Sequence, residues 1–204
     1  LTLSDLTLRG GELFPTSVSD FCCNGGAIRN DSSDVTLNRV AILNNRAVQG
    51  GAIEVQTGRL FINDSRIDGN TSARQGGAIY GAMGGLLRID RSSISNNIAG
   101  ALLVPDSSGQ GGGGILWRND GQGEIIDSSI VGNRILFNVR SGGGIQSTGG
   151  PLDILRSELR SNEATGDGGG IQYDGAFGPT GMRNSTLSGN FAAGQGSAVS
   201  AITN

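Results

Sequence analysis

The sequence contains no histidine and no lysine, so all 15 of its basic residues are arginine. Without histidine the chain has no imidazole to serve as a general base, a metal ligand or a pH switch near neutrality. This excludes most of the familiar hydrolase mechanisms and zinc sites. Any enzymatic interpretation therefore has to work without histidine and lysine.

Long apolar runs are also missing. The longest is far shorter than the ~20 residues that a membrane-spanning helix needs, and Leu1 begins a strand-like pattern with no basic segment before it. We therefore expect a soluble chain with no membrane span. The formal net charge is -3 and the arginines are scattered, which argues against nucleic acid as a partner.

Cysteine is scarce: Cys22 and Cys23 are the only two, and they are adjacent. Their Cα atoms lie about 3.8 Å apart across a trans peptide, which is closer than the ~4.4 Å lower limit of ordinary disulfides. A bond between them would be strained. We expect two small apolar residues in a loop; free thiols and a disulfide to another chain are the alternatives.

Glycine, in contrast, is abundant, with 37 residues, and recurs in a fixed pattern. Hydrophobic residues alternate with polar ones, a Ser and an Asn follow at fixed distances, and each copy ends in a segment of the Gly-Gly-Ala-Ile type. The clearest copy runs from Leu60 to Ile79, with Ser65 and Asn70 between them. Repeated units made of short alternating runs indicate strands rather than helices.

The period of this repeat predicts the fold. One Asn recurs every 25 to 36 residues, at Asn45, Asn70, Asn97, Asn133, Asn162 and Asn190. The Gly-rich strands end at Ile28, Ile53, Ile79, Ile115, Ile145, Ile171 and Val199. Short strands at this period are typical of a solenoid whose turns hydrogen-bond to the turns above and below. The sequence therefore predicts an all-β fold, a single-stranded right-handed parallel β-helix of about seven rungs, with residues 1–204 in one domain.

Stacking of rungs predicts columns of equivalent residues. The Gly-rich strand endings form one aliphatic column, and two more are Leu37, Ile62, Ile89, Ile125, Ile154 and Met182, and Ile42, Ile67, Ile94, Ile130, Leu159 and Leu187. The Asn column is expected to lie at a left-handed corner, because Asn tolerates that backbone conformation and its amide can bond to the next Asn. A second polar stripe is expected from Ser65, Ser92, Ser128, Ser157 and Ser185.

These motifs resemble those of a known family. The pairing of Gly-Gly-Ala-Ile with Ile-x-x-Asn resembles the GGA(I/L/V) and FxxN repeats of chlamydial polymorphic outer-membrane proteins and related bacterial surface β-helices. Here Ile or Leu replaces the Phe, as in Ile67 to Asn70 and Leu187 to Asn190. The resemblance implies a secreted or cell-surface location and a role in adhesion or as an autotransporter passenger.

Insertions are the expected place for function in a repeat protein. Three segments exceed the basic period, at 12–24, 98–112 and 134–142, and they should project from the same edge of the column. A further expansion contains Asn119, Asp120 and Gly121. That tripeptide offers oxygen ligands for calcium, although it is more often an ordinary turn.

One outward stripe is the second candidate site. The residue after each Gly-rich strand ending should point away from the core, as at Arg29, Glu54, Tyr80, Leu116, Gln146, Gln172 and Ser200. With Trp117 and Tyr173 nearby, Tyr80, Gln146 and Gln172 form a candidate surface for carbohydrate or for a protein partner. The competing interpretation is an ordinary solvated sheet face.

The enzymatic alternative is a calcium-dependent polysaccharide lyase, with arginine as the base. Its candidate residues are Arg118, Asp174, Glu54 and Asp31, and they fall on different rungs. No paired carboxylates of the kind a hydrolase needs are evident. We therefore favour a non-enzymatic extracellular adhesion or scaffolding module with no required cofactor.

The third alternative is a structural subunit of a larger complex or filament. The repeat is already under way at Leu1 and continues almost to Asn204, with no amphipathic capping helix at either end. Unpaired strand edges invite association. We expect the ends to be covered by a longer protein or by other chains, through end-to-end or lateral contacts.

Overall fold

The computed structural model describes residues 1–13, 23–83, 85–101, 111–119, 121–137, 141–175 and 181–202. These residues form short strands joined by turns and bends. Cys22, Asp120 and parts of the three insertions lie outside the described residues, so the expectations placed on them have no structural counterpart here.

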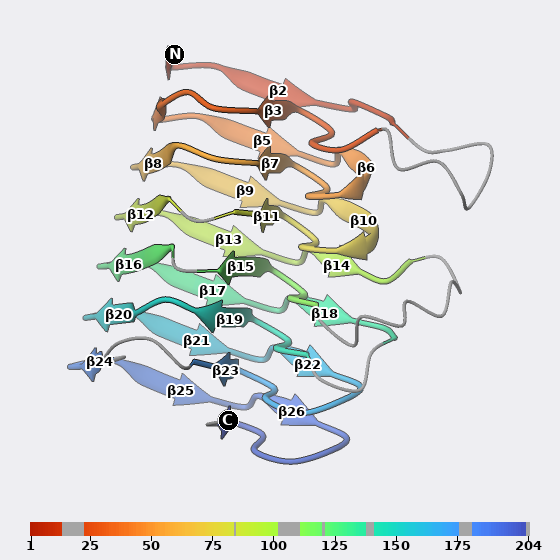
Figure 1. Ribbon diagram of the computed structural model, residues 1–204, viewed down its shortest axis with the longest axis vertical. Coiled ribbons are helices and arrows are strands. Elements are labelled where there is room, and N and C mark those ends of the chain that lie inside the picture. The colour runs from red at the N-terminus through yellow and green to blue at the C-terminus, as the bar shows by residue number, and fades with distance from the viewer. Residues whose placement is uncertain are drawn as a thin grey trace.

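Successive turns of the chain contribute strands to four parallel sheets, which we call sheets A, B, C and D in the order in which the chain passes through them (Figure 1). The strands of sheet A are β1 (Thr2–Ser4), β4 (Val35–Asn38), β8 (Arg59–Asn63), β12 (Leu86–Asp90), β16 (Gln122–Ile126), β20 (Leu152–Leu155) and β24 (Gly181–Arg183). The strands of sheet B are β2 (Thr7–Arg9), β5 (Ala41–Leu43), β9 (Arg66–Asp68), β13 (Ser93–Ser95), β17 (Ser129–Val131), β21 (Glu158–Arg160) and β25 (Thr186–Ser188).

The other two sheets complete the rung. The strands of sheet C are β6 (Arg46–Gln49), β10 (Thr71–Gln75), β14 (Ile98–Ala99), β18 (Arg134–Ile135), β22 (Glu163–Ala164) and β26 (Phe191–Ala192). The strands of sheet D are β3 (Ile28–Asn30), β7 (Ile53–Val55), β11 (Ile79–Gly81), β15 (Ile115–Asn119), β19 (Ile145–Gly149), β23 (Ile171–Asp174) and β27 (Val199–Ile202). Sheets A, B and D have seven strands and sheet C has six. The predicted all-β parallel solenoid is confirmed.

The pairing register matches equivalent residues of successive repeats. In sheet D, for example, Ile79 pairs with Ile53 on one side and with Ile115 on the other. The same register holds in sheets A and B, where Ile62 pairs with Ile89 and Ile67 pairs with Ile94. Residues that are far apart in the sequence therefore stack in columns along one axis.

Apolar columns fill the interior. Ile62, Ile67, Ile79, Ile94 and their equivalents belong to one continuous cluster of buried side chains. Full burial of one such side chain contributes roughly 1.5–3 kcal/mol. The last members of two columns, Met182 and Val199, are 37% and 45% exposed because only one neighbouring rung covers them.

The Asn column forms a buried ladder. The backbone N–H and the side-chain Nδ2 of Asn70 both donate to Oδ1 of Asn97, at 2.9 and 3.0 Å, and the same pair of bonds links Asn45 to Asn70, Asn97 to Asn133, Asn133 to Asn162 and Asn162 to Asn190. Nδ2 of Asn70 also donates to the carbonyl of Ile42, at 3.1 Å. The ladder thus joins neighbouring rungs through groups that are shielded from water.

The expected left-handed conformation of the ladder residues is wrong by one position. The residue before each ladder Asn has the positive φ, and these residues are Asn44, Gly69, Asn96, Gly132, Ser161 and Gly189. The physical reason is that the residue with the positive φ makes the bend at the corner. This bend points the side chain of the following Asn inward.

Candidate functional site

The stripe on the outer side of sheet D does not form the solvated face that the alternation predicted. Five of its seven residues, Glu54, Tyr80, Leu116, Gln146 and Gln172, are buried. Residues at the ends of two insertions contact it: Asn24 Nδ2 donates to Glu54 Oε1 at 2.8 Å, and the Gly111 N–H donates to Gln146 Oε1. The alternation correctly separates these residues from the inner core, but it carries no information about what covers the outer face.

The aromatic residues of the predicted ligand surface lie on opposite sides of sheet D. Tyr80 packs with Ala82 and Leu116 on the outer side. Trp117 belongs to the main core, and Tyr173 packs against that core. Strand alternation explains this, because Trp117 and Tyr173 each directly follow an outward-pointing residue of their strand and therefore point inward. The structure therefore does not place Trp117 and Tyr173 on the surface expected to bind carbohydrate.

The four residues considered for a lyase do not come together at one place. Glu54 Oε2 lies 3.5 Å from Arg29 Nε, which also donates to Asp31 at 2.9 Å. Arg118 Nη1 is 3.3 Å from the Tyr80 hydroxyl. Asp174 accepts hydrogen bonds from Gln146 at 3.2 Å and from Gln172 at 2.8 Å. Asp31 and Glu54 share Arg29, but Arg118 and Asp174 lie on other rungs and do not converge with them.

Metal ligation was the other chemical expectation. Within the described ranges, no group of three or more His, Cys, Asp or Glu side chains is placed to hold a metal ion. The same part of the chain contains no helix that is long and apolar enough to cross a membrane.

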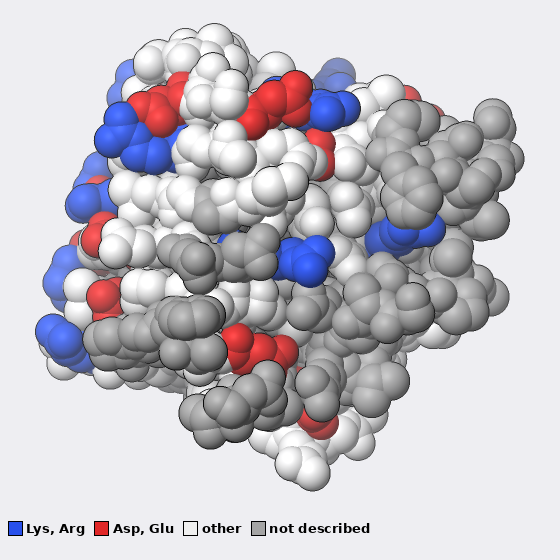
Figure 2. All heavy atoms as spheres, in the orientation of Figure 1, with Lys and Arg blue, Asp and Glu red and all other residues white. Residues whose placement is uncertain are grey.

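A different site lies at the corner between sheets A and B, where each rung has one residue with a positive φ. The first six of these residues alternate in charge and the seventh is Asn, and we call the column the charged ladder: Asp5, Arg39, Asp64, Arg91, Asp127, Arg156 and Asn184. Their φ values run from 44° to 55°, in the left-handed region that residues other than glycine rarely adopt. Figure 2 shows blue and red side chains alternating down the left-hand edge of the molecule, where the arrows of sheet A end in Figure 1.

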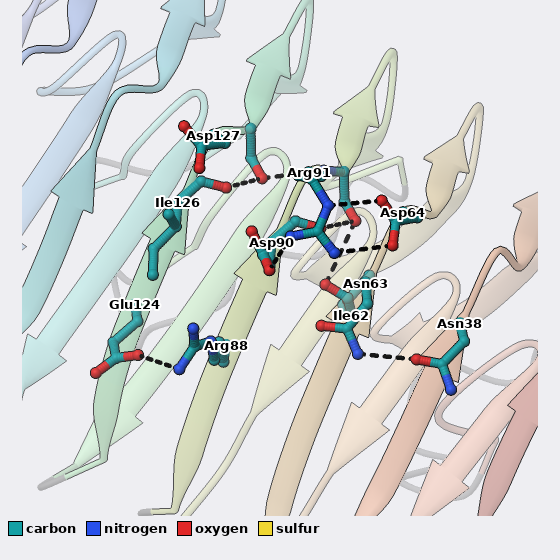
Figure 3. Close-up of polar contacts among 12 residues, drawn as sticks. Asn38, Ile62, Asn63, Asp64, Arg88, Asp90, Arg91, Glu124, Ile126 and Asp127 are labelled. Atoms are coloured by element: carbon teal, nitrogen blue, oxygen red, sulfur yellow. Dashed lines mark hydrogen bonds and ion pairs between the residues drawn. The ribbon is translucent and has the colours of Figure 1, made fainter.

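The charged ladder consists of bidentate ion pairs between neighbouring rungs. The Nε and Nη2 atoms of Arg91 donate to the two carboxylate oxygens of Asp64, at 2.8 and 2.9 Å (Figure 3). Arg39 binds Asp5 in the same way at 2.6 and 2.8 Å, and Arg156 binds Asp127 at 2.7 and 2.8 Å. Arg91 also donates through Nη1 to Asp90, at 2.6 Å.

These pairs shift the pKa values of the acids. The hydrogen bond from Arg91 is the main cause that lowers the pKa of Asp64, and the hydrogen bonds from Arg39 and Arg156 do the same for Asp5 and Asp127. Arg91 also lowers the pKa of Asp127 through its charge, although it does not bond to it. The ladder is therefore one electrostatic network along the corner.

Directly behind the charged ladder, the predicted Ser stripe forms a second hydrogen-bonded ladder. The Ser65 N–H donates to Ser92 Oγ at 2.9 Å, and equivalent bonds join Ser92 to Ser128, Ser128 to Ser157 and Ser157 to Ser185. Each Oγ in turn donates to the carbonyl two residues earlier, as from Ser92 to Asp90 at 2.7 Å. The Ser side chains are thus held rigidly at the base of the corner.

Together these residues line a groove of about 840 Å³ that follows the column. One wall is the charged ladder from Arg39 to Asn184, and the buried base is Val40, Ser65, Ser92, Ser128 and Ser157. The opposite wall consists of the outward residues that begin the sheet B strands, Ala41, Arg66, Ser93, Ser129, Glu158 and Thr186. We call this feature the corner groove.

The charged ladder was not predicted from the sequence, although the repeats contain a signal for it. In the aligned repeats, the residue before the Ser position alternates strictly between Asp and Arg from Asp5 to Arg156. The aliphatic and Asn columns keep the same residue type from rung to rung, whereas this column alternates between two residue types.

Comparison with known proteins agrees with the repeat. Residues 64–82 match the Chlamydia polymorphic membrane protein repeat, and this segment contains the Ser65, Ile67, Asn70 and Gly76 to Ile79 positions of the motif. The resemblance to this type of repeat is thereby confirmed. Neither the curated proteins nor the solved structures include one that matches the chain significantly.

Proposed function

We propose that this chain is a non-enzymatic β-helix module of a bacterial cell surface, which acts as a rigid scaffold and presents its lateral faces to other molecules in adhesion. The observation that carries the proposal is that three columns of polar side chains form hydrogen bonds between neighbouring rungs. The Asn ladder, the Ser ladder and the charged ladder all bond one rung to the next. Because these bonds hold neighbouring rungs together, they favour a long and stiff column.

The repeat match supports the location. It points to a bacterial surface or outer-membrane protein, because the matched family is a polymorphic membrane protein repeat. The candidate lyase residues Arg118 and Asp174 bind Tyr80, Gln146 and Gln172, which favours a structural role for them.

Surface location is tested on intact cells of the bacterium that encodes the chain. An antibody against the purified chain should label intact cells, and protease added outside should remove the signal. Labelling that requires permeabilised cells would contradict the proposal.

Adhesion is tested by displaying the chain on a non-adherent carrier bacterium and measuring attachment to immobilised extracellular glycans and proteins. The matched control is the same display of Ile79→Asp, which we expect not to fold because it places a carboxylate in the core. Equal attachment by both displays would rule out a role for the folded column.

A further inference from the structure

We propose that the corner groove binds a linear, uncharged polysaccharide that lies parallel to the axis of the column. This inference deepens the proposed function and rests on it for access of the groove to extracellular polymers. Four features of the groove carry it: its shape, its hydrogen-bonding groups, its charge balance and its period.

The shape of the groove requires an extended ligand. Its two walls and its base are columns of equivalent residues from successive rungs, so they run in one direction over the rungs from Arg39 to Thr186. A compact ligand would contact only one or two rungs. A linear polymer would extend across several rungs, and each added unit would increase the contact.

The groove offers groups that suit hydroxyls. Arg39 and Arg156 use Nε and Nη2 for their ion pairs, and within the described part of the chain Nη1 of each has no hydrogen bond. The opposite wall adds the hydroxyls of Ser93, Ser129 and Thr186, which are at least partly exposed. Hydroxyls both donate and accept, as the hydroxyls of a sugar do.

The charges of the groove disfavour a strongly charged polymer. Asp64 and Asp127 are neutralised by Arg91 and Arg156, and Arg66 binds Asp68 at 2.7 Å. A polyanion would have to compete with these carboxylates for the arginines, and a polycation would have to compete with the arginines. An uncharged polymer leaves every pair in place.

The period of the groove matches a repeating disaccharide. Because Asp and Arg alternate, like groups recur every second rung, which is about 9.6 Å at the spacing of β-strands. An extended β-1,4-linked chain turns each sugar over relative to the last, so it also repeats every second unit. Equivalent sugar edges would therefore meet the same type of side chain, Asp or Arg, along the charged ladder, while the opposite wall varies from rung to rung.

An extended peptide fits the groove less well. Strand addition needs unpaired backbone groups at a sheet edge, whereas the backbone at this corner is already bonded between rungs. The N–H of Arg66 donates to Val40, that of Ser93 to Ser65 and that of Ser129 to Ser92, each at 2.9 Å. Among the described residues, the lining of the groove includes no aromatic or large apolar side chain, so it offers no pocket for apolar side chains there.

The test is titration calorimetry of the purified chain with cellohexaose and chitohexaose, up to millimolar concentration. We expect at least one of these neutral hexasaccharides to bind. Its affinity should be at least about tenfold higher than that of the matching disaccharide, because the longer sugar contacts more rungs. Ser129→Gln, which extends a side chain into the groove from β17, should weaken binding about tenfold or more. Ser93→Gln on β13 should do the same.

The matched control is Val131→Gln. It lies on the same strand and the same face as Ser129 but outside the groove lining, and it should leave the affinity unchanged. Circular dichroism melting curves identify any variant that fails to fold. Loss of binding in a folded Ser129→Gln variant, with retention in Val131→Gln, supports the proposal.

Three results would overturn the inference. These are the absence of neutral hexasaccharide binding, binding of an acidic hexagalacturonate in place of the neutral sugars, and binding of a decapeptide of alternating serine and glycine without any binding of sugar. Each would leave the surface location of the chain untouched, because antibody labelling of intact cells measures that location independently.

Discussion

Single buried amides connect the rungs of this column. Asn97 is fully buried, and its Nδ2 donates to the Ile67 carbonyl at 3.2 Å and to Asn133 Oδ1 at 2.9 Å. Its Oδ1 accepts from the backbone and the side chain of Asn70. One side chain thus satisfies several polar groups that water does not reach.

Replacing Asn97 by Ala should therefore be costly. The buried Ile67 carbonyl and Asn70 N–H would lose their partner, and the free energy of unfolding should fall by about 3 kcal/mol or more. The control is Asn63→Ala, which removes one half-buried bond to Asn38 and should cost about 1 kcal/mol or less. Urea denaturation measures the free energy of unfolding of both variants. Equal losses would show that a buried ladder Asn contributes no more than a half-buried Asn outside the ladder.

A residue-scale fit also explains Gly81. A Cβ at this position would lie 2.2 Å from Cε3 of Trp117, which pairs with it on the next rung. We expect Gly81→Ala to lower the free energy of unfolding by about 1–3 kcal/mol through overpacking. In the Trp117→Leu background the same substitution should cost much less, which a double-mutant cycle measures. Additive effects would contradict the steric explanation.

At the scale of the element, the corner between sheets A and B combines a strained backbone with paired charges. Seven left-handed residues in one column are unfavourable individually, and the three Arg residues among them are of a type that adopts this conformation less readily than Asn184 and the three Asp residues. The bidentate Arg–Asp pairs hold the corner side chains of neighbouring rungs together. Since these side chains remain exposed to solvent, added salt should weaken their attraction.

The lowered pKa values of the ladder acids predict an acid-sensitive column. Asp5, Asp64 and Asp127 titrate below the ordinary 3.8 in the folded chain, so their pairs stabilise it fully above that pH and lose this effect as the pH falls through the lowered values. With no histidine to titrate, the melting temperature should stay nearly constant from about pH 5 to 8 and fall below about pH 4.

The control for this prediction is Asp64→Asn combined with Asp127→Asn, since Asn184 already occupies the same corner position. The double variant should show a smaller fall of the melting temperature between neutral and acid pH than the natural chain. A transition centred near pH 6 in both proteins would mean that other groups govern the acid response.

At the scale of the whole molecule, every rung depends on its neighbours. In the described ranges strands pair with the rung before and the rung after, so stability is approximately a sum of rung and interface terms. Ile79 lies inside the column and pairs with both neighbouring rungs of sheet D. A disruptive substitution of Ile79 therefore affects its contacts with both neighbouring rungs.

Ile79→Asp should lower the free energy of unfolding by about 4 kcal/mol or more, because it buries an unpaired carboxylate. Hydrogen exchange should show loss of protection in the rungs on both sides. Thr36→Asp, on the outer side of sheet A, is the control and should change stability by roughly 0.5 kcal/mol or less. Unchanged stability of Ile79→Asp would contradict the inward placement.

The sequence by itself determined the solenoid, the aliphatic columns and the Asn and Ser columns. Two regularities carry this information: alternation assigns each side chain to one side of its strand, and the repeat period brings equivalent residues into register. Both are local or periodic, so they can be read without coordinates. The inward placement of Ile62, Ile67 and Ile79 follows from them directly.

Only the tertiary structure decided what covers the outer sides and which charges meet. Alternation places Glu54 and Gln146 outside the core but cannot show that Asn24 and Gly111, from insertions, contact them. The pairing of Arg91 with Asp64 joins residues 27 apart and depends on a left-handed turn in every rung. Burial and ion pairing arise from three-dimensional proximity across rungs of unequal length, and the corner groove exists only because the rungs stack in register.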